Sequence, residues 1–148
     1  MKYFYNPESS MEEWIENCQK YNDEFNNIKH LFSKKFLIEY AKKGFHDCFL
    51  YEYGYFNKKH SLCFYIKLKD TKYCHIITYN NIFSVDIHFS KPRSNDLCVF
   101  LYDEFSLHEK GLSHEFSLAD EGNIKIVFKK LLYKKVKRQD NSMADSHC

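Results

Sequence analysis

Apolar residues recur at helical spacing in the first third of the chain and at every second position in most of the remainder. A Ser10-x-x-Glu13 capping box predicts the start of a first helix, because hydroxyl and carboxylate can each bind a backbone amide of the first turn. The polar run 22–24 predicts its end. Its apolar face would be formed by Met11, Trp14, Ile15, Cys18 and Tyr21.

A second helix is predicted over about residues 28–43, where apolar residues again form a stripe. Ser33 lies within this segment and can break the helix while capping its second half. Gly44 follows two lysines and is a good stop signal, since glycine adopts the left-handed conformation at little cost.

Beyond Phe45 the apolar period changes to two, which is typical of strands with one dry and one wet face. The connections between these segments are short, and short connections favour antiparallel neighbours. We therefore predict an α+β fold, with two N-terminal helices packed on an antiparallel β meander of about seven strands. The expected strands are 48–56, 61–69, 73–79, 82–89, 97–107, 112–118 and 124–136.

The alternation also predicts which side chains form the core beneath the helices, with Trp14 in the same layer. These are Leu62, Phe64, Ile66, Val85, Ile87, Phe116, Ile126 and Phe128. Residues 91–96 read as a loop, and no linker divides the chain. We expect one domain over residues 1–137 and a disordered tail over 138–148.

Composition narrows the functional classes. The 148 residues carry a formal net charge of +2 and only two arginines, which makes nucleic acid an unlikely partner. No apolar run is long enough to span a membrane, and residues 1–7 do not resemble a signal peptide, so a cytoplasmic location is expected. The six cysteines form no CxxC pair and are expected to be reduced, acting as small apolar residues.

Three short motifs occur in order along the predicted sheet: Phe-His-Asp at 45–47, Ile-Thr-x-x-x-Ile at 77–82 and Leu-Tyr-x-Glu at 101–104. Over about residues 44–133 the chain resembles small bacterial proteins of domain families of unknown function. Some of those proteins are regarded as immunity proteins of polymorphic toxin systems. The resemblance implies a helix-plus-meander fold and a toxin-neutralising role, and it brings no biochemical activity.

Within these motifs, His46, Asp47, Tyr102 and Glu104 are interpreted as a structural corner between helix and sheet. Asp47 can accept backbone amides in the turn, and His46 can donate to a carbonyl or to Glu104. The competing hypothesis treats this corner as a functional site.

Other combinations of polar residues have both a functional and a structural explanation. Asp86 and His88 share a strand face and can bind a metal with His75, but a solvated polar face of the sheet is the preferred explanation. A small ribonuclease would use His and Glu as base and acid, here His46, Glu104 and His114. Cys48 beside His46 is better read as a buried cysteine. We predict no catalytic residue, no metal and no cofactor.

Charge is distributed unevenly. The C-terminal strand is rich in lysine, a pattern usually explained by a solvated face. The first helix carries carboxylates that suit a basic protein partner, namely Glu12, Glu13, Glu16, Asp23 and Glu24. The leading hypothesis is a bacterial immunity protein, monomeric or weakly dimeric, that neutralises a cognate toxin by stoichiometric binding. The alternative is a nucleic-acid-acting protein, either a small ribonuclease or an RNA binder using the Lys-rich C-terminal strand.

Overall fold

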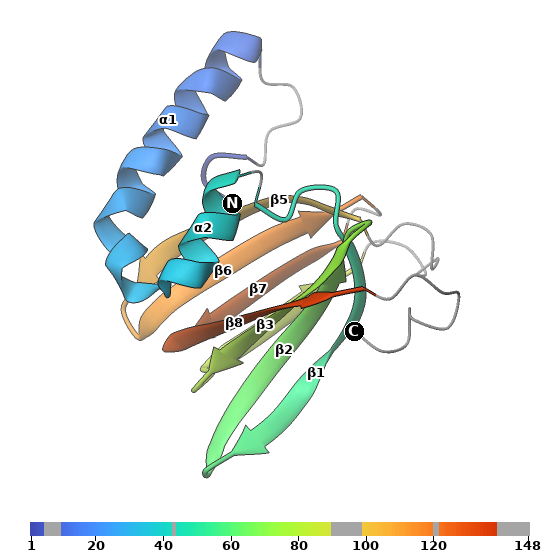
Figure 1. The fold of residues 1–148 in the computed structure, drawn as a ribbon. Helices are drawn as coiled ribbons and strands as arrows, with labels where there is room; N and C mark the ends of the chain where they lie inside the picture. The colour runs from blue at the N-terminus through green and yellow to red at the C-terminus, as the bar shows by residue number, and fades with distance from the viewer. Residues whose placement is uncertain (5–9, 43, 90–98, 120–121, 139–148) are drawn as a thin grey trace.

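The computed structural model describes residues 1–4, 10–42, 44–89, 99–119 and 122–138. Its fold is α+β, as predicted, with the helices first and antiparallel strands after them (Figure 1). In chain order the elements are α1 (Met11–Ile28), a 3-10 turn (Lys29–Leu31), α2 (Lys34–Lys42), β1 (Phe49–Lys58), β2 (Ser61–Lys69), β3 (Tyr73–Asn80), β4 (Ser84–His88), β5 (Phe100–His108), β6 (Gly111–Leu118), β7 (Asn123–Phe128) and β8 (Lys130–Lys137).

The helix boundaries follow the expected capping residues at three places. The Glu13 backbone N–H donates to Ser10 Oγ at 3.1 Å, and the Phe36 N–H donates to Ser33 Oγ at 3.2 Å. Gly44 has a φ of +60°, which lets the chain turn away from α2. Neither helix, over the residues described, is long and apolar enough to cross a membrane.

α1 is longer than predicted. The polar run 22–24 was expected to end it, yet it continues to Ile28. Phe25 and Ile28 follow Tyr21 at spacings of four and seven, so they extend the same apolar face, while the polar residues between them face outward.

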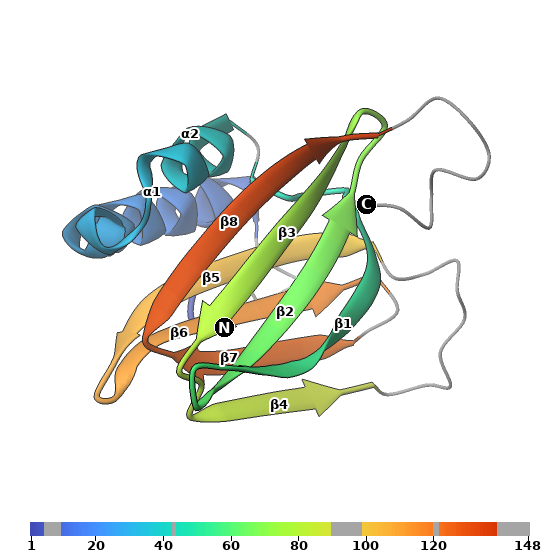
Figure 2. The same ribbon diagram turned by 60° about the horizontal axis from the view of Figure 1, so that its bottom comes forward.

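The strands of the described chain form two four-stranded antiparallel sheets, in the orders β1-β2-β3-β8 and β4-β7-β6-β5. This corrects the expected single meander of about seven strands. Figures 1 and 2 show the two sheets as separate layers. The chain passes from one sheet to the other twice, between β3 and β4 and between β7 and β8. At these crossings Lys129 N–H donates to the Asn80 carbonyl at 3.1 Å, and Phe83 N–H donates to the Val127 carbonyl at 2.8 Å.

The predicted strand 124–136 is the one that divides. In β7 the fully buried positions include Ile124, Ile126 and Phe128, whereas in β8 they shift to Leu131. The inward-facing positions therefore change from even-numbered to odd-numbered residues at Lys129, the single residue that connects β7 in one sheet to β8 in the other.

The core lies between the two sheets and is closed on one side by the helices (Figure 2). α1 contacts β5 and α2 contacts β8, which are edge strands of different sheets. The prediction that the helices pack across the face of a single sheet was therefore wrong. Phe36 from α2 is 0% exposed and packs edge-on against Phe105 at a ring distance of 5.6 Å.

Most of the predicted core is confirmed. The side chains of Phe64, Ile66, Phe116, Ile126 and Phe128 are fully buried, whereas Val85 and Trp14 are only partly buried. Two assignments were wrong, Leu62 and Ile87, at 46% and 38% exposed. Leu62 precedes the first β2 residue that pairs with β3, so it lies where the β1–β2 hairpin extends beyond the sheet. Ile87 is on β4, an edge strand with β7 as its neighbour.

The expected loop at 91–96 lies outside the described residues, and so does the expected tail beyond residue 138. Arg138 itself is described, and its backbone N–H donates to the Lys72 carbonyl at 2.8 Å.

Candidate functional site: an aromatic cleft with an acidic floor

A cleft of about 500 Å³ lies where α1, the junction between α2 and β1, and the first half of β5 meet. The corner that begins at Gly44 shapes one side of it. Asp47, at a φ of +69°, donates its backbone N–H to the Phe100 carbonyl at 2.9 Å, and Phe100 donates back to the Cys48 carbonyl at 2.8 Å. These bonds hold the corner against the start of β5, which brings the His46 and Tyr102 rings to 5.6 Å.

Aromatic rings form a wall of this cleft. Trp14 from α1 lies 5.1 Å from Phe4 and 5.0 Å from Tyr102, measured between ring centroids. Such rings present flat apolar surface and negative π faces, so they favour an apolar or cationic group packed against them.

Asp103 also lines the cleft, and its carboxylate is 12% exposed. The pairing of β5 with β6 shifts register between Phe100 and Asp103. An irregularity of this kind re-aims side chains, which explains how the adjacent residues Tyr102 and Asp103 reach the same cleft.

Behind Asp103 a chain of hydrogen bonds leads into the core. His114 Nε2 lies 2.7 Å from Asp103 Oδ2, and its Nδ1 lies 2.7 Å from the Tyr79 hydroxyl. The His114 ring is 0% exposed and stacks on Phe105 at 3.8 Å. Since a carboxylate only accepts, Nε2–H donates to Asp103, and in the neutral ring Nδ1 accepts from Tyr79. The hydrogen bond from His114 therefore fixes the Asp103 carboxylate on its core side, and the opposite side of the carboxylate lines the cleft.

Two tyrosines lie beside this carboxylate, the buried Tyr21 and the half-buried Tyr40. Burial raises the pKa of Tyr40 well above its usual value, and the nearby negative charge of Asp103 raises it further. The Tyr21 hydroxyl lies 2.7 Å from that of Tyr40 and accepts the Phe105 backbone N–H at 2.8 Å. Both hydroxyls therefore stay protonated, and Asp103 supplies negative charge at the floor of the cleft.

The four residues of the predicted corner are only partly brought together. His46 and Tyr102 line the cleft, and His46 Nδ1 lies 3.2 Å from the 70% exposed Asp47 carboxylate. The expected bond between His46 and Glu104 does not form. Glu104 accepts instead from the backbone N–H groups of Tyr3 at 2.9 Å and Phe4 at 3.3 Å, because it faces the N-terminal segment.

The five carboxylates of α1 are all exposed. Glu12, Glu16 and Asp23 follow one another at spacings that place them along the line opposite the buried face. Beside that line lie Met11 and Ile15, which are 73% and 59% exposed. Two of the five carboxylates have partners: Glu16 forms an ion pair with Lys20 at 3.1 Å, and Glu24 forms one with Lys2 at 2.9 Å and a hydrogen bond with the Tyr3 hydroxyl.

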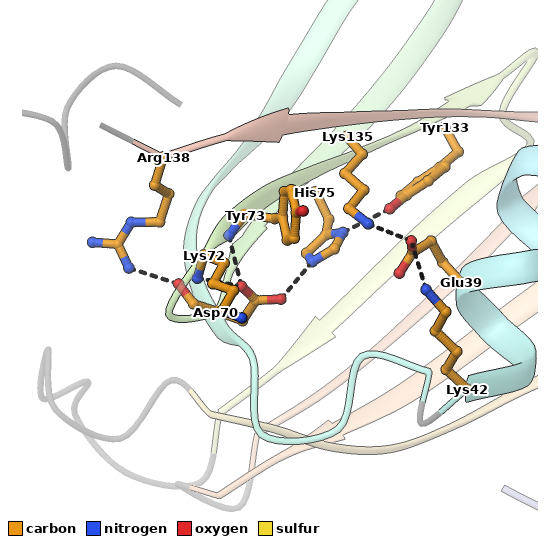
Figure 3. Close-up of polar contacts among 9 residues, drawn as sticks. All are labelled: Glu39, Lys42, Asp70, Lys72, Tyr73, His75, Tyr133, Lys135 and Arg138. Atoms are coloured by element: carbon orange, nitrogen blue, oxygen red, sulfur yellow. Dashed lines mark hydrogen bonds and ion pairs between the residues drawn. The ribbon is translucent and has the colours of Figure 1, made fainter. Parts of the chain in front are cut away.

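A second polar cluster lies at the opposite end of β3 from the crossing to β4 (Figure 3). His75, 3% exposed, places Nε2 at 2.9 Å from Asp70 Oδ2 and Nδ1 at 2.7 Å from the Tyr133 hydroxyl. Beside it, Lys135 Nζ donates to Glu39 Oε1 at 2.5 Å. The proposed partners Asp86 and His88 are exposed on β4, which belongs to the other sheet, so they do not meet His75.

The remaining candidates separate in space. His114 is enclosed in the core and Glu104 faces the N-terminal segment, so these two do not join His46 in a ribonuclease-like triple. Cys18, Cys48 and Cys63 carry thiols, but Cys74 is disulfide-bonded, contrary to the expectation of reduced cysteines. Lys130, Lys134 and Lys137 are exposed on β8, as expected of a solvated basic face.

Sequence reasoning missed Asp103 and His114 as a pair. A signal exists, since Asp103 precedes the buried Phe105 by two positions and His114 precedes the buried Phe116 by two. Both polar side chains should therefore point toward the core from two strands that are joined by a short turn. Because buried polar groups are usually hydrogen-bonded, this placement predicts a hydrogen bond between them. The chain matches no protein-family model, and no curated protein is significantly similar to it in sequence.

Proposed function

We propose that this chain is a non-catalytic immunity protein that neutralises a cognate toxin by direct one-to-one binding. The observation that carries the proposal is that α1 contributes to two features: its outer face carries exposed carboxylates, and its inner face lines the aromatic cleft that has Asp103 at its floor. The resemblance of the corner and strand motifs to immunity proteins supports the same function.

The partner is expected to be basic. Carboxylates at Glu12, Glu16 and Asp23 attract a positively charged surface and accelerate encounter. Met11 and Ile15 beside them supply apolar area that a partner can bury.

The cleft is suited to an anchoring side chain of that partner. An arginine or lysine that enters the cleft would lie against the contacting rings of Trp14 and Tyr102 and approach the Asp103 carboxylate. Deeply seated arginines of this kind are common hot spots of protein interfaces. Blocking a toxin surface in this way requires no chemistry from the inhibitor.

The test is a pull-down from the native host followed by mass spectrometry and by inhibition assays with the captured protein. A toxin whose activity falls to zero at one equivalent supports the proposal. The double charge reversal Glu12→Lys with Glu16→Lys should slow association at least tenfold at low salt. Glu109→Lys, an exposed charge reversal in the β5–β6 turn, is the matched control and should leave binding unchanged.

A second candidate function is RNA binding, which is favoured by the outer face of the sheet β1-β2-β3-β8. Lys69 lies over the Tyr51 ring at 5.1 Å and Lys67 over the Tyr65 ring at 5.8 Å, and exposed lysines follow on β8. Basic residues alternating with aromatic rings suit single-stranded nucleic acid. Recovery of RNA without a protein partner in the same pull-down would reverse the ranking.

A further inference from the structure

We propose that Cys48, Asp70 and His75 form a binding site for one zinc-type divalent metal ion. Each residue offers one ligand atom, and the three atoms all lie within 4.8 Å of one another. The site lies apart from the cleft and is independent of the proposed toxin binding.

Strand pairing creates this convergence. The first residue of β1, Phe49, pairs with the last residue of β2, Lys69. Cys48 directly precedes Phe49 and Asp70 directly follows Lys69, so these two residues lie at the same end of the sheet. β3 then pairs Cys74 with Lys69 and His75 with Leu68, which returns His75 to the same end of the sheet. Three segments of the chain are thus held together by the backbone.

The Asp70 carboxylate is oriented before any ion binds. Its Oδ1 accepts the backbone N–H groups of Lys72 at 2.8 Å and Tyr73 at 2.7 Å (Figure 3). Oδ2 is directed at His75 Nε2, at 2.9 Å. Oδ2 is therefore the oxygen available for a metal, and the carboxylate would bind through one atom.

His75 has the supporting contact that metal-binding histidines usually have. When Nε2 binds a metal, Nδ1 carries the proton and donates to the Tyr133 hydroxyl, already 2.7 Å away (Figure 3). Tetrahedral zinc, with bonds of ~2.0–2.3 Å, separates ligand atoms by about 3.3–3.7 Å, so Nε2 and Oδ2 would open by less than an ångström.

The donor set indicates the type of ion. One thiolate, one imidazole and one carboxylate suit zinc, whereas calcium and magnesium prefer all-oxygen sites. The thiolate and the carboxylate together balance a divalent charge, which favours the ion at a buried position. Two cations lie beside the cluster: Lys135 is paired with Glu39 at 2.5 Å, and Arg138 donates to the Asp70 backbone carbonyl at 2.6 Å, so each has an oxygen partner that offsets its repulsion.

These features favour a metal over a nucleophilic thiol. Cys48 is 2% exposed, so a substrate cannot reach its sulfur, and both nitrogens of His75 are already hydrogen-bonded. The Asp70 side chain is 26% exposed, which leaves one side of the cluster accessible to a small ion and to a water as fourth ligand.

The test uses the full chain, purified without chelator and titrated with Zn²⁺ and with Co²⁺. We expect one equivalent of either ion, and a thiolate-to-cobalt charge-transfer absorption in the near ultraviolet. Cys48→Ala and Asp70→Asn should each weaken binding at least about a hundredfold, and Tyr133→Phe about tenfold, the usual loss for a supporting residue. Cys63→Ala, which removes another buried cysteine, is the matched control and should bind normally.

The wild-type cobalt spectrum keeps the proposal falsifiable even if a variant fails to fold. Absence of the charge-transfer band at saturating Co²⁺ would overturn the site. Equal affinity of wild type and a folded Cys48→Ala variant would do the same, because the ion would then lie elsewhere on the chain.

Discussion

Truncating Asp103 tests whether the hydrogen-bonded chain from the cleft to Tyr79 stabilises the core. In Asp103→Ala the His114 Nε2–H loses the acceptor that lies 2.7 Å away, within a ring that is 0% exposed. A buried donor without its acceptor costs ~1–3 kcal/mol, and bonds to charged groups lie toward the upper end. We therefore expect a loss of about 2–3 kcal/mol in the free energy of unfolding.

The asparagine variant provides the internal comparison. Asp103→Asn keeps an oxygen acceptor and loses only the charge, so it should cost about 1 kcal/mol. For a chain of this size each kcal/mol lowers the melting temperature by roughly 2–4 °C, which predicts about 5–10 °C for alanine and about 3 °C for asparagine.

Urea unfolding followed by fluorescence measures both variants, since Trp14 is the one tryptophan of the sequence and lies 5.0 Å from Tyr102. Repeating Asp103→Ala in a His114→Phe background isolates the bond, because phenylalanine can keep the stacking on Phe105 but has no N–H to satisfy. There the alanine change should cost less than about 1 kcal/mol. Equal costs in both backgrounds, or equal costs for alanine and asparagine, would refute the reasoning.

Three further outcomes are expected. Phe64→Ala should cost ~3–5 kcal/mol in chemical denaturation because Phe64 is fully buried, whereas Leu62→Ala at a 46% exposed position should cost far less. Gly111→Ala should lower the melting temperature more than Gly44→Ala, because both have positive φ but only at Gly111 would a Cβ come within 2.4 Å of the Phe128 carbonyl oxygen; similar shifts would contradict this. Burial raises the pKa of Glu104, although backbone N–H groups of Tyr3 and Phe4 oppose the shift. The unfolded chain therefore loses the Glu104 carboxyl proton at a lower pH than the folded chain does. The free energy of unfolding should fall as pH rises from about 4.3 through the raised pKa, and Glu104→Gln should flatten this pH dependence. Unfolding free energies measured across this range decide the point, and an unchanged slope in the variant would count against it.

Local signals in the sequence predict the elements well. The capping residues Ser10 and Ser33 and the stop at Gly44 act within one turn of helix, so their effect does not depend on the rest of the chain. Alternation likewise identifies the inward side chains of β2, β6 and β7. These features depend on neighbours a few residues apart.

The pairing of strands and the contacts between distant residues are harder to predict from local sequence patterns. The change of parity at Lys129 is visible in the sequence, but assigning β8 to a different sheet requires knowing that it pairs with β3. Glu104 was placed with His46 because both belong to recognisable motifs, whereas the register shift in β5 separates them. Cys48, Asp70 and His75 meet only through the combined registers of β1, β2 and β3.

The position of the helices against β5 and β8 has a consequence for biosynthesis. α1 and α2 are translated first, yet the edge strands they cover are among the later segments of the chain. Phe32 and Phe36 therefore leave the ribosome well before Tyr133, which Phe36 contacts at 5.8 Å between ring centroids. Closure must wait for β8 to pair with β3 across some fifty intervening residues, and such long-range pairing is slow. During that interval the nascent aromatic helices are exposed to solvent, which makes them the segment expected to recruit chaperones.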